Sequence, residues 1–130
     1  MENLTELVLE QKITYLGTIE GDQARVRPMG HFSLIDGKFT WCTNNTKEVY
    51  KQVLANPKIE FCMFAGGKTI RLSGTCLPTD SAEAKAEFLK LQPGVAKFYG
   101  GSEDILKIMQ FQDATVSITA KGVKEATKLY

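Results

Sequence analysis

The side chains best suited to bind a ligand are the arginines, of which the chain has only three. Arg25 and Arg27 are separated by a single residue in a strand-like run, so the alternation of side chains along a β-strand predicts that they share one face. The third, Arg71, also falls in a strand-like run. A guanidinium group presents a planar fork of donors that suits phosphate or another fixed anion. The pair therefore predicts an anion site, whereas a solvated or salt-bridged face is the alternative for a single strand arginine.

A second stretch with the same chemistry follows at residues 43–50, where a polar loop opens a helix. Asn45, followed three residues later by Glu48, is a variant of the capping box. Lys47 falls in the first turn, where the helix dipole disfavours a cation. A bound anion would remove that conflict, because helix N-termini bind phosphate through free backbone N–H groups and Thr46 would add a hydroxyl. An ordinary cap with a solvated lysine is the alternative interpretation.

Other reactive side chains point to no separate site. The cysteines are Cys42, Cys62 and Cys76, which are odd in number, widely spaced and without a C-x-x-C pair. We expect buried, reduced thiols. His31 is the single histidine and has no cysteine at ligand spacing, so we expect no metal site. It either touches a ligand at the end of the arginine strand or is a satisfied polar group. No catalytic acid or base is predicted.

Length and composition set the class of protein. A chain of 130 residues is expected to form one domain, residues 1–130. A formal net charge of +1 argues against nucleic acid as a partner, since binding the phosphate backbone needs a clustered basic surface. No apolar run is long enough to span a membrane. Because the first six residues lack the basic start and apolar core of a signal peptide, we expect a cytoplasmic protein.

The hydrophobic pattern predicts mostly strands. Strand-like runs occupy residues 13–19, 24–35, 38–43, 58–65, 68–77, 105–111 and 114–120, and helices are predicted at 3–12, 46–56 and 82–91. Asp36-Gly37 is a two-residue hairpin signal, and the polar tail from Lys121 is expected to fray. The fold class is therefore mainly β with helices: a six- to seven-stranded antiparallel barrel, which leaves no exposed edges, with about three helices packed against its ends.

The order of the motifs resembles one known family. The stretches that carry the likeness are Gly21–Met29, Trp41–Val49, Asn56–Glu60 and Ile70–Gly74. In order and spacing they resemble the FMN-binding split-barrel family, the pyridoxamine 5'-phosphate oxidase-like proteins, and in particular their short bacterial members. The resemblance extends from the first helix to the last strand. It implies a homodimeric split barrel with two FMN sites at the subunit interface.

The resemblance also implies roles for individual residues. The arginine strand would run beside the flavin, and the strand-to-helix loop would hold its phosphate through Arg25, Thr46 and Lys47. Contacts with the isoalloxazine and ribityl chain fall to Val26, Arg27, Pro28 and Met29. Thr43 and Asn44 would reach polar atoms of the flavin, and Arg71 would approach from the neighbouring strand.

Activity is less determined than the cofactor. Pyridoxamine phosphate oxidases proper are longer and carry a C-terminal arginine-containing substrate segment, and the segment 122–130 offers nothing comparable. We therefore expect an FMN-dependent oxidoreductase with another, unknown substrate, its chemistry resident in the flavin. The first alternative is a non-catalytic stress or sensor protein that binds flavin, haem or deazaflavin, with His31 as the one available haem ligand. The second is a dimeric barrel without a ligand.

Overall fold

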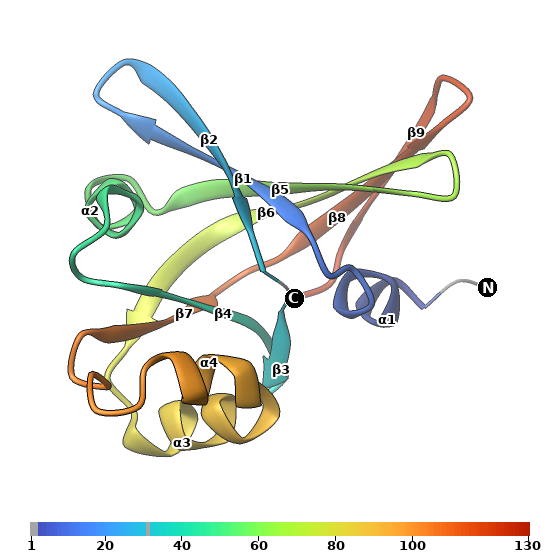
Figure 1. Ribbon diagram of the computed structural model, residues 1–130. Helices are drawn as coiled ribbons and strands as arrows, with labels where there is room; N and C mark the ends of the chain where they lie inside the picture. Colours follow the sequence, from blue (N-terminus) through green and yellow to red (C-terminus); the bar gives the residue numbers. More distant parts are fainter. Residues whose placement is uncertain (1–2, 31) are drawn as a thin grey trace.

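Most of the chain forms one antiparallel sheet, with helices at its sides (Figure 1). The structure is a computed structural model that describes residues 3–30 and 32–130. Within them the strands are β1 Thr14–Glu20, β2 Gln23–Met29, β3 Ser33–Ile35, β4 Lys38–Asn44, β5 Lys58–Ala65, β6 Lys68–Thr79, β7 Leu106–Phe111, β8 Thr115–Ala120 and β9 Val123–Lys128. The helices are α1 Leu4–Leu9, α2 Glu48–Ala55, α3 Ala82–Leu91 and α4 Pro93–Phe98. The mainly β class is confirmed, with nine strands and four helices in the described part where six or seven and about three were expected.

The sheet is open, so the expected closed barrel is wrong. Its strand order is β2-β1-β5-β6-β7-β4-β3, and β8 joins β6 on one side and β9 on the other. The 12-residue β6 pairs with two different strands along the same edge: residues 69–73 pair with β8 and residues 76–79 pair with β7. The β1–β2 and β8–β9 hairpins extend away from each other in Figure 1. Their outer edges therefore cannot hydrogen-bond to one another and close the sheet.

The long strand expected over residues 24–35 is two strands. β2 ends at Met29, opposite Thr14 of β1, and β3 begins at Ser33 and pairs with β4 instead. The chain changes partner between them, so one continuous ladder cannot form. Pro28 lies near the end of β2, which is an edge strand, and this agrees with the rule that proline in a sheet is confined to edges.

The tail does not fray. Lys121 (φ 51°) and Gly122 (φ 78°) form a two-residue turn that returns the chain as β9 along β8. At its end the Leu129 N–H donates to the Ala114 carbonyl at 2.8 Å, and the Tyr130 hydroxyl accepts from the Phe39 N–H at 2.8 Å. All six residues of β9 are exposed, so no apolar alternation indicated a strand.

The core lies on the inner face of the sheet. Phe61 of β5 is at its centre, with ring centroids 4.7 Å from Phe32 and 5.3 Å from Trp41, both edge-to-face. Helix α2 closes this core over β1 with Val49 and Val53. A second apolar cluster fills the space between the sheet and helices α3 and α4, which lie together at the bottom of Figure 1.

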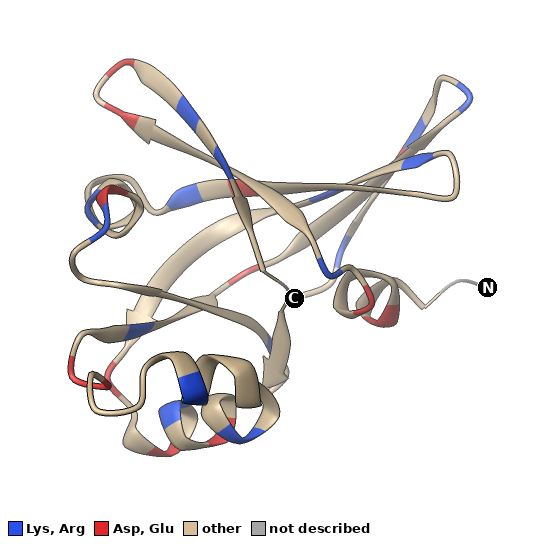
Figure 2. Ribbon diagram, in the orientation of Figure 1, with Lys and Arg blue, Asp and Glu red and all other residues tan. Residues whose placement is uncertain are grey.

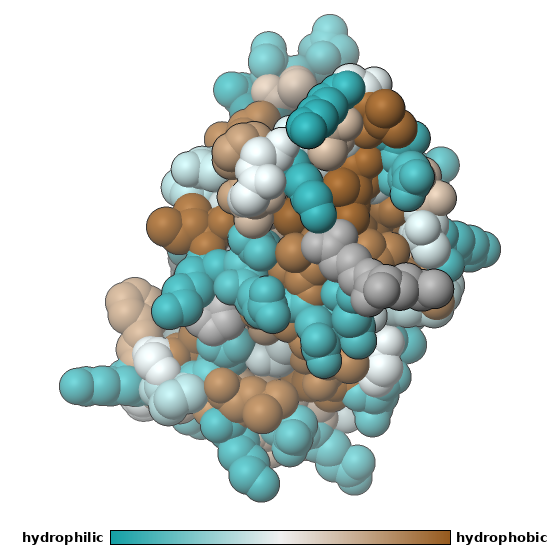
Figure 3. All heavy atoms as spheres, turned by 90° about the vertical axis from the view of Figure 1, so that its right-hand side faces the viewer, coloured by the Kyte–Doolittle hydropathy of each residue, from teal (hydrophilic) through white to brown (hydrophobic). Residues whose placement is uncertain are grey.

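Some large apolar side chains remain uncovered. Tyr15, Ile19, Val26 and Phe64 are exposed on the opposite, outer face of β1, β2 and β5. Figure 3 also shows apolar side chains reaching the surface among hydrophilic ones, on the side where α1 and the β5–β6 turn lie. None of the helices in the described ranges is long and apolar enough to cross a membrane.

Candidate functional site

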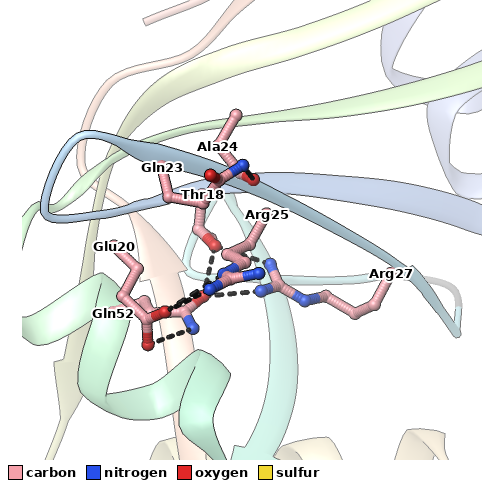
Figure 4. Close-up of polar contacts among 7 residues, drawn as sticks. All are labelled: Thr18, Glu20, Gln23, Ala24, Arg25, Arg27 and Gln52. Carbon is pink, nitrogen blue, oxygen red and sulfur yellow. Dashed lines mark hydrogen bonds and ion pairs between the residues drawn. The ribbon is translucent and has the colours of Figure 1, made fainter.

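The two arginines of β2 lie on the inner face, beside α2. The β1–β2 register pairs Arg25 with Thr18 and Arg27 with Leu16. Leu16 and Thr18 are both buried on the α2 side of the sheet. Since directly opposed residues in an antiparallel pair point the same way, the arginines share this face. Figure 4 shows both guanidinium groups turned toward Gln52 on α2.

Arg27 is held by neutral acceptors. Its Nη1 donates to Thr18 Oγ1 at 2.7 Å and to the Leu16 carbonyl at 3.3 Å, and its Nη2 donates to Gln52 Oε1 at 2.5 Å. No carboxylate in residues 3–30 and 32–130 forms an ion pair with it. Burial, and then the charge of Arg25, lower the pKa of the Arg27 guanidinium. The result is a half-buried positive charge without a directly paired anion.

Gln52 connects the two arginines. Its Oε1 also accepts from Thr18 Oγ1 at 2.6 Å, while its Nε2 donates to Glu20 Oε2 at 3.3 Å. The side chain is 6% exposed, and it lies on the same buried side of α2 as Val49 and Val53. A buried amide of this kind is stable only when both its ends are bonded. Gln52 therefore ties β1, β2 and α2 into one polar cluster.

Arg25 is paired with Glu20 across the β1–β2 turn. Its Nε and Nη2 donate to Glu20 Oε1 at 3.0 and 2.9 Å. The side chains are 50% and 44% exposed, so the pair adds little to stability. Figure 2 shows basic residues along β2 and acidic ones near the turn. The Arg25 hydrogen bond, and then the one from Gln52, hold the pKa of the Glu20 carboxyl below its usual value.

The loop before α2 is organised by Asn44. Its Oδ1 accepts from the Thr46 N–H at 3.0 Å and from the Thr46 hydroxyl at 2.5 Å, and its Nδ2 donates to Tyr99 at 2.8 Å. The expected Asn45–Glu48 capping box is wrong, because the N-cap is Lys47 and no side chain caps the helix. The Thr46 hydroxyl donates within the loop. Lys47 remains exposed at the start of the helix.

Thr43 carries the one buried side-chain oxygen or nitrogen in the described part of the chain that has no hydrogen-bond partner. It is 2% exposed, and alternation along β4 places it on the face of Trp41, within the core that α2 covers. An unsatisfied buried hydroxyl costs about 1–3 kcal/mol. A polar atom of a ligand would satisfy this group, and the family resemblance implies a contact of Thr43 with flavin.

The remaining predicted site residues divide between the two faces. Met29 lies on the arginine side and packs against the core. Val26 (71% exposed) and Pro28 lie on the outer face, and so does Arg71, whose Nε is 3.6 Å from Glu60 Oε2. Within one chain Arg71 therefore does not meet Arg25 and Arg27. The suggested haem ligand His31 lies outside the described residues.

An open cavity of ≈ 590 Å³ lies on the outer face and reaches Arg25. Residues that line it include Gly17, Ile19, Val26, Glu60, Ser73 and Gly74. Gly17 and Gly74 contribute no side chain to its floor, and a Cβ on Gly74 would lie 2.2 Å from the Asp113 carbonyl oxygen. The cavity opens on the outer face, whereas the side chains of the polar cluster around Gln52 lie on the inner face.

Sequence reasoning missed Thr18, Glu20 and Gln52. The two-residue Gly21-Asp22 turn pairs Glu20 with Gln23, and this register puts Thr18 opposite Arg25. Strand pairing could thus have indicated Thr18 and Glu20. Nothing local distinguishes Gln52 from a solvated helix glutamine.

Comparison with known proteins identifies the family of the chain. The protein-family model described as pyridoxamine 5'-phosphate oxidase matches residues 1–124. The chain belongs to the pyridoxamine 5'-phosphate oxidase family. This confirms the family predicted from the ordered motifs.

Solved structures of similar proteins share this fold. A NimC/NimA family protein from Clostridium acetobutylicum is 32% identical, with a TM-score of 0.87, and the match covers 99% of this chain and 95% of that one. A protein from the same organism related to general stress protein 26 of B. subtilis is 20% identical, with a TM-score of 0.77 and coverages of 96% and 91%. A haem-binding protein from Mycobacterium smegmatis is 14% identical, with a TM-score of 0.75 and coverages of 98% and 59%. The last two show a shared fold alone, and no curated protein matches significantly.

Proposed function

We propose that this member of the pyridoxamine 5'-phosphate oxidase family is an oxidoreductase that binds FMN as its redox cofactor. The observation that carries the proposal is the half-buried charge of Arg27, held by neutral acceptors beside Arg25. Such a charge is more stable when an anion neutralises it. A phosphomonoester, with about −1.5 to −2 charges at neutral pH, suits two neighbouring guanidinium groups.

Residues from three elements would hold the group. Arg25 and Arg27 would bind its phosphate, together with Lys47 at the start of α2, where backbone N–H groups and the helix dipole favour an anion. Thr43, whose buried hydroxyl has no partner in the described structure, would bond a polar atom of the flavin. When bound, FMN would supply the redox chemistry. The protein's part is to orient it through the cluster that Gln52 connects.

We also propose that the protein is a homodimer. Tyr15, Ile19, Val26 and Phe64 expose apolar side chains on one continuous outer face, which a second copy would cover. Arg71, which lies on this face, would then be at the interface. Sedimentation at equilibrium tests this directly, with Phe64→Glu expected to shift a dimer toward monomer. A wild-type chain that sediments as a monomer would contradict the proposal.

The cofactor experiment is identification by absorption and mass spectrometry of the purified protein, followed by titration of the apoprotein with FMN. We expect flavin bands, and a loss of FMN affinity of at least about tenfold in Arg27→Ala, since a hydrogen bond to a charged group contributes about 1.5–3 kcal/mol. Glu125→Gln, a charge change on exposed β9, is the control. Failure of the apoprotein to bind FMN would overturn the proposal.

Two further readouts separate the alternatives. Reduction of the bound flavin by NADH or NADPH at turnover rates supports an enzyme, whereas binding without turnover supports a storage or sensor protein. A Soret band in place of flavin bands would indicate haem, which the similar protein from Mycobacterium smegmatis binds.

A further inference from the structure

The carboxylate of Glu20 occupies the binding edge of Arg25. The two donors it engages, Nε at 3.0 Å and Nη2 at 2.9 Å, are neighbouring N–H groups on one edge of the guanidinium fork. Both donate to a single carboxylate oxygen, Glu20 Oε1, and a phosphate oxygen would need the same two donors. A phosphate cannot take this edge of Arg25 until the Glu20 carboxylate leaves it.

The carboxylate has a second contact in the cluster. Its second oxygen, Oε2, accepts from Gln52 Nε2 at 3.3 Å, and Gln52 is itself fixed by Thr18 and Arg27. A Glu20 displaced from Arg25 would thus remain near the phosphate as a like charge. The Glu20 carboxylate cancels one of the two guanidinium charges in the cluster, and this weakens the attraction for a phosphate near −2.

We propose that Glu20 is a specificity-determining residue, whose carboxylate competes with the phosphate of a flavin for Arg25. This inference rests on the proposed FMN site and adds a residue that sets which flavin the site prefers. The competition weakens binding of phosphorylated ligands selectively. A flavin without phosphate gains nothing from the Arg25 edge, so its affinity does not depend on Glu20.

The test compares the wild type with Glu20→Gln. Dissociation constants for FMN and for riboflavin are measured by flavin fluorescence at low salt and at 0.5 M salt. We expect the variant to bind FMN about three- to tenfold more tightly, the range set by an exposed ion pair plus a nearby like charge. Riboflavin affinity should stay within about twofold, and the FMN gain should shrink at high salt. Glu125→Gln controls for net charge, since it removes an exposed carboxylate from β9.

The outcomes are distinguishable. Weaker FMN binding in Glu20→Gln would mean that Glu20 orients Arg25 for the phosphate. An unchanged ratio of the FMN and riboflavin dissociation constants would mean that Glu20 plays no part in ligand preference. Either result overturns the inference but leaves the proposed FMN binding intact. Equal tightening of FMN and riboflavin would also overturn it, because the effect would then not involve phosphate. If the wild type and the variant bind neither flavin, the proposed function fails and the inference fails with it.

Discussion

Arg27 Nη2 donates to Gln52 Oε1 at 2.5 Å across 25 residues of sequence. This contact joins an edge strand of the sheet to the helix whose start is the second half of the candidate site. An edge strand is paired on one side only, and this side-chain contact adds a direct link between β2 and α2. Gln52 therefore holds Arg27 directly and Arg25 through Glu20.

Replacing Gln52 should therefore affect stability and ligand affinity together. Gln52→Ala leaves the Thr18 hydroxyl and Arg27 Nη2 without their shared acceptor, and we expect a loss of about 1–3 kcal/mol in the free energy of unfolding. FMN affinity should fall as Arg27 loses its position. Urea denaturation and flavin titration measure the two effects. Gln23→Ala, at the exposed start of β2, should change the free energy of unfolding by no more than about 0.5 kcal/mol. Equal effects of both changes would refute the role given to Gln52.

The position of Arg71 on the outer face separates it from Arg25 within one chain. Arg25→Ala should weaken FMN binding by about 1.5–3 kcal/mol if it bonds the phosphate. Arg71→Ala, measured by the same titration, reports whether the cofactor is shared. No effect would confine the site to one chain's inner face, whereas a comparable loss in a dimer would place Arg71 of the second copy at the cofactor. An unchanged FMN affinity in Arg25→Ala would remove that residue from the site.

The close approach of β6 to the β7–β8 loop requires a glycine. A Cβ on Gly74 would lie 2.2 Å from the Asp113 carbonyl oxygen and 2.7 Å from its Oδ1. The Asp113 side chain also accepts from the Thr75 N–H at 2.6 Å, so it cannot withdraw freely. Gly74→Ala should lower the free energy of unfolding by about 1–3 kcal/mol. Gly17→Ala meets the Glu60 carbonyl at an ordinary 3.6 Å and is the matched strand control; similar urea midpoints for the two variants would contradict this account.

Burial raises the pKa of the Cys42 thiol to about 11 and that of the Cys76 thiol to about 12, the second despite a hydrogen bond from Trp41 that lowers it. At pH 8 buried Cys76 should react with a thiol reagent far more slowly than in urea, with the partly exposed Cys42 and Cys62 as internal comparisons. Because the folded pKa values lie above the unfolded value near 9, their contribution to stability is complete below pH 9 and is lost as pH rises toward 11 and 12. Reaction of Cys76 in folded protein at the unfolded rate would disprove the burial.

The hydroxyl of Tyr130 anchors the C-terminal segment. It accepts from the Phe39 N–H at 2.8 Å in a partly buried setting. Tyr130→Phe should cost about 1–2 kcal/mol, since the backbone donor loses its partner. Tyr15→Phe, which removes an exposed hydroxyl on the outer face, is the control. Hydrogen exchange gives a second measurement: amides of 123–128 that pair with β8 should be protected, and exchange at the rate of an unfolded chain would restore the prediction of a frayed tail.

Local patterns were sufficient for the features that depend on neighbours in sequence. The two-residue turns at Gly21-Asp22, Asp36-Gly37 and Gly66-Gly67 have backbone signatures of their own, and in each turn at least one glycine has a positive φ that glycine adopts without strain. Helix 82–91 was predicted with the bounds that α3 has, because apolar spacing and a proline after its end are local signals. The family followed for the same reason, since its motifs occur in a fixed order along the chain.

Long-range packing decided the rest. Strand β9 has no apolar alternation of its own and forms because its turn returns it to β8. Gln52 looks like any polar helix residue until α2 packs on β1, and the face that Arg71 occupies follows from which strands pair. Residue order dictates turns, periodicity and family, because these arise within a few residues. The cluster around Arg27 instead requires backbone pairing and helix docking, which bring donors and acceptors together over distances in sequence that no local pattern records.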